Sequence, residues 1–95
     1  MAFGTIRADI IQGTATSINL ATAGQYDFNG NILPDADNSR NIGSPALRFA
    51  NIYTGDLHLA NDRGDWTVVE ETEYLSLRNN KTGKTFRLLM EEVDS

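Results

Sequence analysis

The sequence contains no cysteine, so it can form no disulfide, offers no thiolate ligand to a metal and has no cysteine nucleophile. Long apolar runs are also missing, since none approaches the roughly 20 residues that a bilayer-spanning helix needs. The N-terminus shows no long apolar segment, so no signal peptide is evident. We therefore expect a protein that is made and folded in the cytosol, or is assembled there into something larger.

Basic residues are few. The chain has 8 lysines and arginines against 13 aspartates and glutamates, which gives a net charge of −5 and a pI of about 4.6. Nucleic-acid backbones and anionic membrane surfaces both require a basic patch, so we expect neither as a partner. With 40% hydrophobic and 8% aromatic residues, the chain is too apolar to be disordered, yet thin for a lone compact globule.

Helical periodicity is missing as well. No segment sustains a 3.6-residue apolar period, and no heptads run far enough for a coiled coil. The 8 glycines and the frequent Asn, Thr and Asp favour short strands and turns instead. Ninety-five residues make one small domain at most, or a piece of a larger assembly. The composition therefore predicts a β-rich fold.

Residues 41–53, which we call the corner segment, carry several local signals in register. Ser44 is suited to cap a helix, and Pro45 follows at the first helical position, where its missing N–H costs nothing. Gly43 permits a tight entry. We predict a single helical turn that fixes a change of direction, followed by a strand over 50–53. Its expected packing residues are Leu47, Phe49, Ile52 and Tyr53.

The N-terminal part alternates loosely between apolar and polar residues. This pattern predicts a strand over Thr5–Ile11, preceded by the apolar Phe3, and a second short one over Thr14–Leu20. Asn29-Gly30 is a tight-turn signal between two very short apolar pieces. These strands are too short to make an ordinary sheet within one chain. We expect them to pair with strands from other chains.

The C-terminal third predicts a three-stranded meander over 66–71, 74–78 and 85–91. Thr72-Glu73 joins the first two strands, and residues 79–84 join the second and third, with Gly83 placed for a left-handed conformation. Before it, residues 56–59 form either the continuation of one bent strand or one arm of a hairpin. The apolar positions expected to share faces and to need a cover are Leu57, Leu59, Trp66, Val68, Leu75, Leu77, Phe86, Leu88 and Met90.

The corner segment resembles a known family. The run Asn41-Ile42-Gly43-Ser44, then Arg48-Phe49 and Asn51-Ile52-Tyr53, is similar to a segment common in bacteriophage tail-fibre and related virion fibre proteins. Residues 54–59 continue the pattern, and residues 61–92 are similar to small phage tail modules. The opening Met1–Ile6 also resembles the start of such proteins.

The resemblance implies a non-enzymatic structural or receptor-binding protein that forms an intertwined homotrimer. It implies assembly in the host cytoplasm, location in the virion, and docking to other virion proteins of the tail or capsid. Many relatives continue into a long C-terminal domain, sometimes a self-cleaving chaperone, whereas no Ser/Lys cleavage arrangement is identifiable here. The resemblance therefore favours a virion structural protein over a complete host-recognising fibre.

Together these observations predict an all-β chain of short strands plus one helical turn. We divide it into an N-terminal shaft or attachment segment over 1–40, the corner and its strand over 41–60, and the meander module over 61–95. The alternative function is a receptor-binding tip for a host surface glycan or protein. Its candidate contact residues, if exposed, are Tyr26, Trp66 and Tyr74.

His58 is the only histidine, and Asp56 is its only partner at strand spacing. In a trimer, three copies could meet on the axis and bind a metal or an anion, but a surface or interface histidine is the more common reading. Asp35, Asp37 and Asn38 form an oxygen-rich run. It fails the calcium-loop pattern, which needs Gly sixth and Glu twelfth, so we interpret it as a solvated turn.

Two short motifs have ordinary explanations. Arg63-Gly64-Asp65 spells an integrin-type tripeptide, but turns use these residues for backbone reasons. Asn80-Lys81-Thr82 has the form of a glycosylation sequon, but a hairpin loop is the better interpretation without a secretory signal.

Clustered acids are the last candidates. Paired carboxylates act in glycoside hydrolysis, which suggests a small glycan-active enzyme as a third hypothesis. Adjacent strand residues point to opposite faces, so Glu70 and Glu71 cannot share one site in a regular strand. We favour a solvated rim with salt bridges to basic neighbours, and expect no cofactor, metal or catalytic residue. The acids are Glu70, Glu71, Glu73, Glu91, Glu92 and Asp94.

Overall fold

The computed structural model describes residues 4–94, so Phe3 and the first three residues of the opening motif lie outside the described residues. The chain divides into two units, which cover 1–33 and 34–95, and each is described by itself. The described part of the first unit contains no assigned strand or helix. All of the regular structure described lies in the second unit.

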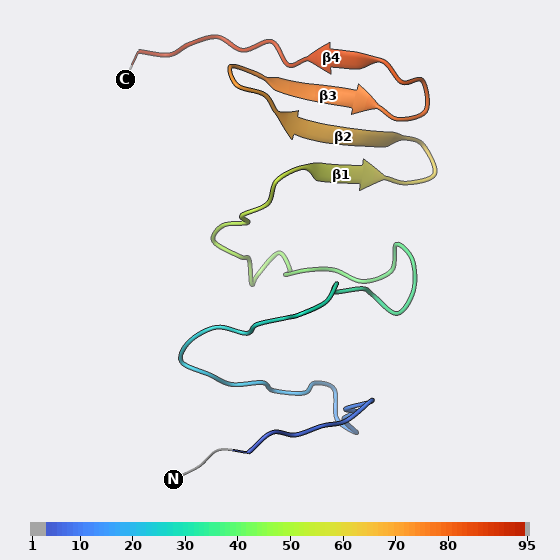
Figure 1. The fold of residues 1–95 in the computed structure, drawn as a ribbon, viewed down its shortest axis with the longest axis vertical. Coiled ribbons are helices and arrows are strands. Elements are labelled where there is room, and N and C mark those ends of the chain that lie inside the picture. Colours follow the sequence, from blue (N-terminus) through green and yellow to red (C-terminus); the bar gives the residue numbers. More distant parts are fainter. Residues whose placement is uncertain (1–3, 95) are drawn as a thin grey trace. The chain divides into compact units, whose positions relative to one another are not determined.

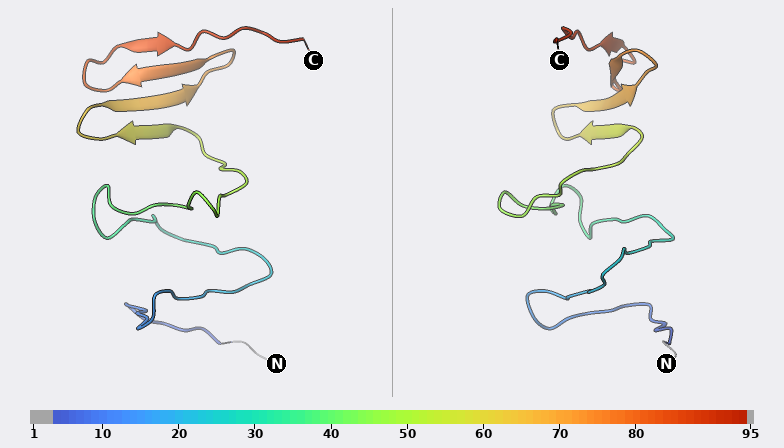
Figure 2. Two further views of the ribbon diagram at one scale, coloured as in Figure 1. Left: turned by 180° about the vertical axis from the view of Figure 1, so that it is seen from behind. Right: turned by 90° about the vertical axis from the view of Figure 1, so that its left-hand side faces the viewer.

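The second unit is built on one antiparallel sheet of four strands (Figure 1). The strands are β1 (Leu57–Ala60), β2 (Asp65–Glu70), β3 (Leu75–Asn79) and β4 (Thr85–Arg87). Their spatial order is β1-β2-β3-β4, so each strand pairs with the next in sequence. The predicted all-β class and the C-terminal meander are confirmed, and β1 adds a fourth strand. Figure 2 shows the strands as a single layer.

Short turns fix the register of this sheet. The N–H of Glu71 donates to the Tyr74 carbonyl at 2.8 Å, which closes the predicted two-residue connection Thr72-Glu73. Gly83 has φ of +79° and donates its N–H to the Asn79 carbonyl at 2.8 Å, as expected for the left-handed residue of the β3–β4 loop. Between β1 and β2, the side chain of Asn61 accepts the N–H groups of residues 63 and 64, which holds a tight turn.

The left-handed Gly83 gives a testable prediction. Gly83→Ala places a Cβ on a backbone with φ of +79°, which costs about 1 kcal/mol. We expect the free energy of unfolding to fall by that amount. Unfolding in urea, followed by the fluorescence of the single tryptophan, measures it. Gly55→Ala is the matched control, because nothing lies within 4 Å of the added Cβ there. Equal shifts in the two variants would contradict a special role for the loop conformation.

The predicted helical turn in the corner segment is wrong. The N–H of Ser44 donates to the Leu47 carbonyl at 2.9 Å, and the Leu47 N–H donates to the Ser44 hydroxyl at 3.0 Å. These two bonds close a reverse turn around Pro45-Ala46 rather than start a helix. Proline at the second position of a β-turn has the same fixed φ that suits the start of a helix. The sequence Ser44-Pro45 is therefore compatible with both structures. Gly43 does take the expected special conformation, with φ of +78°.

Several predicted strands are also absent from the described residues. No strand is assigned over Thr5–Ile11, Thr14–Leu20 or 50–53, and β4 ends at Arg87 rather than continuing to residue 91. The short apolar pieces around Asn29-Gly30 likewise form no ladder. An alternating sequence becomes a strand only where a neighbouring strand supplies hydrogen-bond partners, and this single chain supplies none to these segments.

The described residues contain no buried apolar side chain. The two buried residues are Thr67, 7% exposed, and Ser76, 3% exposed, and both lie in the middle strands of the sheet. A single antiparallel layer covers its central backbone with its own small side chains, but it cannot cover its large ones. The sheet therefore positions an apolar surface without enclosing it.

Candidate functional site

The register of the four strands places the large apolar side chains on one surface. Leu57 lies opposite Val68, which lies opposite Leu77, which lies opposite Phe86. Leu59 lies opposite Trp66 in the next row. Side chains alternate between the two faces along each strand, and residues that lie opposite one another on paired strands point to the same face. We call this surface the apolar face, formed by Leu57, Leu59, Trp66, Val68, Leu75, Leu77, Phe86 and Leu88.

The structure thus brings together on one face the predicted packing residues of the sheet. The residues of the outer strands remain about half exposed, with Leu57 at 49%, Leu59 at 51% and Phe86 at 50%. Leu88 follows β4, donates its N–H to the Leu75 carbonyl at 2.9 Å and is 43% exposed. The central members are half-buried by their neighbours. The strand register thus places half-exposed leucines side by side on the apolar face. The role of this face in assembly stays a prediction.

An aromatic pair crosses the middle of the apolar face. The ring centroids of Trp66 and Phe86 lie 6.0 Å apart with a 43° tilt, although β3 separates their strands. The pair therefore links the side chains of β2 and β4 across the strand that contains Leu77. A Cβ on Gly64 would lie 3.2 Å from the indole nitrogen of Trp66, so the small residue leaves room for the ring beside the β1–β2 turn.

The opposite surface, which we call the polar face, contains a hydrogen-bonded network. Its members around Thr67 are His58, Asp65 and Asn80. The Asn80 amide donates to the Thr67 hydroxyl at 3.0 Å and to the Asp65 carboxylate at 2.9 Å. The hydroxyl lies 3.1 Å from Nδ1 of His58, and its own hydrogen is free to be donated to that nitrogen. The only histidine therefore serves β1–β2 pairing.

Sequence reasoning missed this network. The alternation around Thr67 is enough to place it opposite Trp66 and Val68, but Asn80 reaches it from a loop, and no spacing in the sequence announces that contact. A second bond on the same face runs from the Ser76 hydroxyl to the Glu71 carboxylate at 3.0 Å. Both buried residues of the sheet thus have their hydroxyl groups paired.

The adjacent acids Glu70 and Glu71 lie on different faces of the sheet. Glu70 lies opposite Leu75 in the register, at the end of a row on the apolar face. Glu71 lies beyond β2, and its carboxylate is held by Ser76 on the polar face. No group of three or more metal-binding side chains is found among residues 4–94. The expectation that the two adjacent glutamates point apart agrees with this register.

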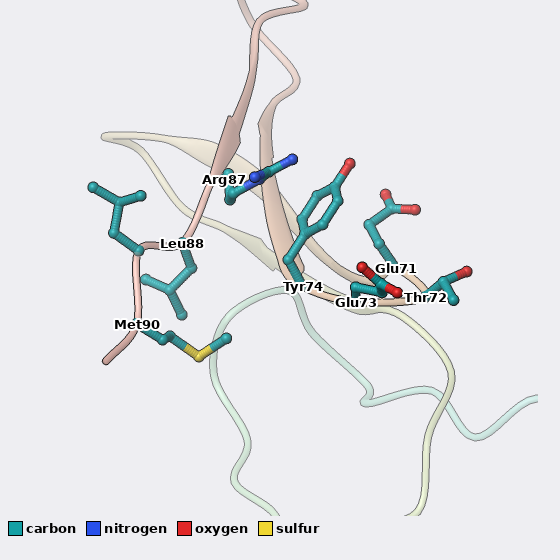
Figure 3. A pocket seen from close by; sticks show the side chains of 8 residues that line it. Glu71, Thr72, Glu73, Tyr74, Arg87, Leu88 and Met90 are labelled. Atoms are coloured by element: carbon teal, nitrogen blue, oxygen red, sulfur yellow. The ribbon is translucent and has the colours of Figure 1, made fainter. Parts of the chain in front are cut away.

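An open hollow of about 630 Å³ lies beside the β2–β3 turn (Figure 3). Tyr74 stands at its centre, and the guanidinium carbon of Arg87 lies 4.2 Å from the centroid of its ring. Arg87 thus covers one face of the tyrosine that was considered a receptor contact. The rest of the lining is acidic on one side and apolar on the other, with Glu71, Glu73, Leu88 and Met90 among the labelled side chains.

The remaining predicted packing residues lie outside the sheet. In the corner segment they are exposed and belong to no strand, and Met90 follows β4 and is exposed too. Tyr26, the third receptor candidate, is exposed in the first unit, where its hydroxyl donates to the Leu20 carbonyl. The corner residues are Leu47, Phe49, Ile52 and Tyr53.

The polar loops are closed by their own side chains. Both oxygens of the Asp35 carboxylate accept from Arg40, at 2.8 and 3.0 Å, which fits a turn better than an open calcium loop. The Arg63-Gly64-Asp65 motif occupies the β1–β2 turn and the start of β2. Asn80 uses its amide within the polar face. Asp35 in the oxygen-rich run and Asn80 in the sequon are thus engaged within the chain.

Comparisons with known proteins add no assignment. No protein-family model, curated protein or solved structure matches the chain. A search of the described residues for a helix long and apolar enough to cross a membrane finds none. The apolar face of the sheet is therefore the feature that points to a function.

Proposed function

We propose that the chain is a structural component of a bacteriophage particle, of the tail-fibre or spike type, which acts by homotrimeric assembly and by docking to other virion proteins. One observation carries the assembly part: the chain has large apolar side chains throughout and no buried apolar core in its described residues. The resemblance of the corner segment to phage fibre proteins supports the virion part. The mechanism is non-enzymatic, because assembly itself is the function.

Exposed apolar surface within the second unit supports assembly. Leu47 is 80% and Ile52 77% exposed in the corner segment, and Leu57, Leu59 and Phe86 on the outer strands are about half exposed. Large contiguous apolar surfaces of this kind mark sites of interaction with other proteins.

The resemblance to phage fibre proteins selects the trimer among the possible assemblies. In a cyclic trimer each copy has two neighbours, so apolar surface on both sides of the sheet's edges would be covered in one closed assembly. The segments of the first unit that form no strand in the single chain would then pair through backbone hydrogen bonds with strands of neighbouring chains.

The test is the absolute mass of the purified protein in solution, by light scattering behind a sizing column, over a series of concentrations. We expect three times 10.5 kDa. Circular dichroism before and after dilution should show strand content rising with association, because the segments without ladders pair only in the assembly. A folded monomer at every concentration would contradict the proposal and would indicate an accessory protein that docks singly on a larger body.

The virion part needs a separate measurement. Binding of the purified trimer to phage particles that lack the protein, compared with binding to host cells, separates the two functions derived from the resemblance. Binding to particles alone supports the structural role. Binding to cells would instead favour the receptor-binding alternative.

A further inference from the structure

We infer that copies of this chain meet through the apolar face of the sheet, with the polar face directed outward. This inference rests on the proposed function and names the interface within it. The occupant of the face is a second copy of the chain. The apolar face has no charged side chain among its members, and Glu70 lies beside it at the end of a row, so a partner of opposite charge would find little to bind there.

The polar face does not require a partner. Its two buried residues, Thr67 and Ser76, already have their hydroxyl groups paired within the chain. The outer members of the apolar face differ from these residues, because 43 to 51% of their surface is exposed. Covering that face removes leucine and phenylalanine surface from water, whereas covering the polar face would displace water from groups that are already satisfied.

The size of the face indicates what else takes part. Four strands about 4.8 Å apart, each about four residues long, span on the order of 250 Å². A standard interface buries about 800 Å² on each partner, so the apolar face is the centre of the contact and not the whole of it. The exposed apolar side chains of the corner segment belong to the same unit and supply further surface of the same kind.

The strand count is compatible with closure by rotation. Because the sheet has four antiparallel strands, β1 and β4 run in opposite directions. Rotation about an axis parallel to the strands keeps each strand's direction, so β4 of one copy would meet β1 of the next as an antiparallel neighbour. All apolar faces would then point to the axis, and both free edges would be covered in the same step.

Two neighbouring residues of β1 give a matched test. Leu59 lies on the apolar face and Ala60 on the polar face, and both are exposed in the single chain. Leu59→Lys and Ala60→Lys change the net charge equally. We expect Leu59→Lys to weaken self-association at least tenfold and to lower the solution mass toward 10.5 kDa, while Ala60→Lys keeps the wild-type mass. Leu59→Gln, which adds no charge, is expected to act in the same direction with a smaller factor.

Each outcome is decisive. A wild-type chain that is monomeric at all concentrations overturns the proposed function and the interface with it. A wild-type assembly that survives Leu59→Lys and Leu59→Gln overturns only the apolar-face interface. Dissociation by Ala60→Lys alone would assign the contact to the polar face. Fluorescence of Trp66, which lies opposite Leu59, and circular dichroism show whether each variant keeps its sheet.

Discussion

Leu77→Asn is expected to destabilise the sheet by about 2–3 kcal/mol, the largest effect of any single substitution considered. Leu77 is the central member of the apolar face, between Val68 on β2 and Phe86 on β4. Asparagine has a similar size, so the substitution replaces methyl contacts with a polar amide at a half-buried position. Urea unfolding followed by Trp66 fluorescence measures the loss.

The neighbouring residue supplies the control. Arg78 follows Leu77 on β3, points to the polar face and is exposed. Arg78→Asn places the same side chain one position along the same strand, and we expect a change within about 0.5 kcal/mol. Comparable losses in the two variants would mean that strand propensity, rather than the apolar face, determines the stability of this region.

Thr67→Val should cost about 1–2 kcal/mol, although valine has the same shape as threonine. The hydroxyl of Thr67 is the shared partner of the Asn80 amide and of Nδ1 of His58, and it is 7% exposed. Removing it leaves the histidine nitrogen without this partner and weakens the link between the polar face and the β3–β4 loop. Urea unfolding gives the free-energy change, and amide hydrogen exchange in β1 should rise because the edge strand loses a side-chain tie.

Thr85→Val tests the specificity of that result. Thr85 lies in the same row of the polar face, opposite Arg78, but it is exposed on the edge strand β4. We expect no loss there, because the valine exposes no buried polar group and favours the strand. A loss of stability equal to that of Thr67→Val would show that the hydroxyl network has no particular importance.

Much of the sheet could be predicted because its determinants are local. The period-2 alternation in 66–70 and 75–78 sets the two faces, and Thr72-Glu73 and Gly83 are residues that tight turns require. The choice between one bent strand and a hairpin around Thr54-Gly55 stayed open in the sequence, and the structure has neither, because no strand is assigned over 50–53. The Asn61 side chain instead holds the turn by which β1 pairs with β2.

Other features could not be predicted from sequence because they depend on partners or on shared signals. The alternation over Thr5–Ile11 predicts a strand, but a strand needs a ladder, and none is available within this chain. Ser44-Pro45 suits both a helix start and a reverse turn, and the residues after it lack the apolar period that would continue a helix. The contact of Asn80 with Thr67 joins a loop to a strand and has no sequence signature.

The pairing of every strand with its sequence neighbour has a consequence for the order of events in the cell. Hairpins with short turns form in roughly 1–10 μs, whereas subunit encounter takes milliseconds to minutes and depends on concentration. Under the proposed assembly, each chain therefore completes its apolar face long before a second copy arrives. The concentration of the chain then sets how long that face stays exposed to water, so rapid synthesis would favour assembly, and slow, dilute synthesis would favour capture by chaperones and proteases.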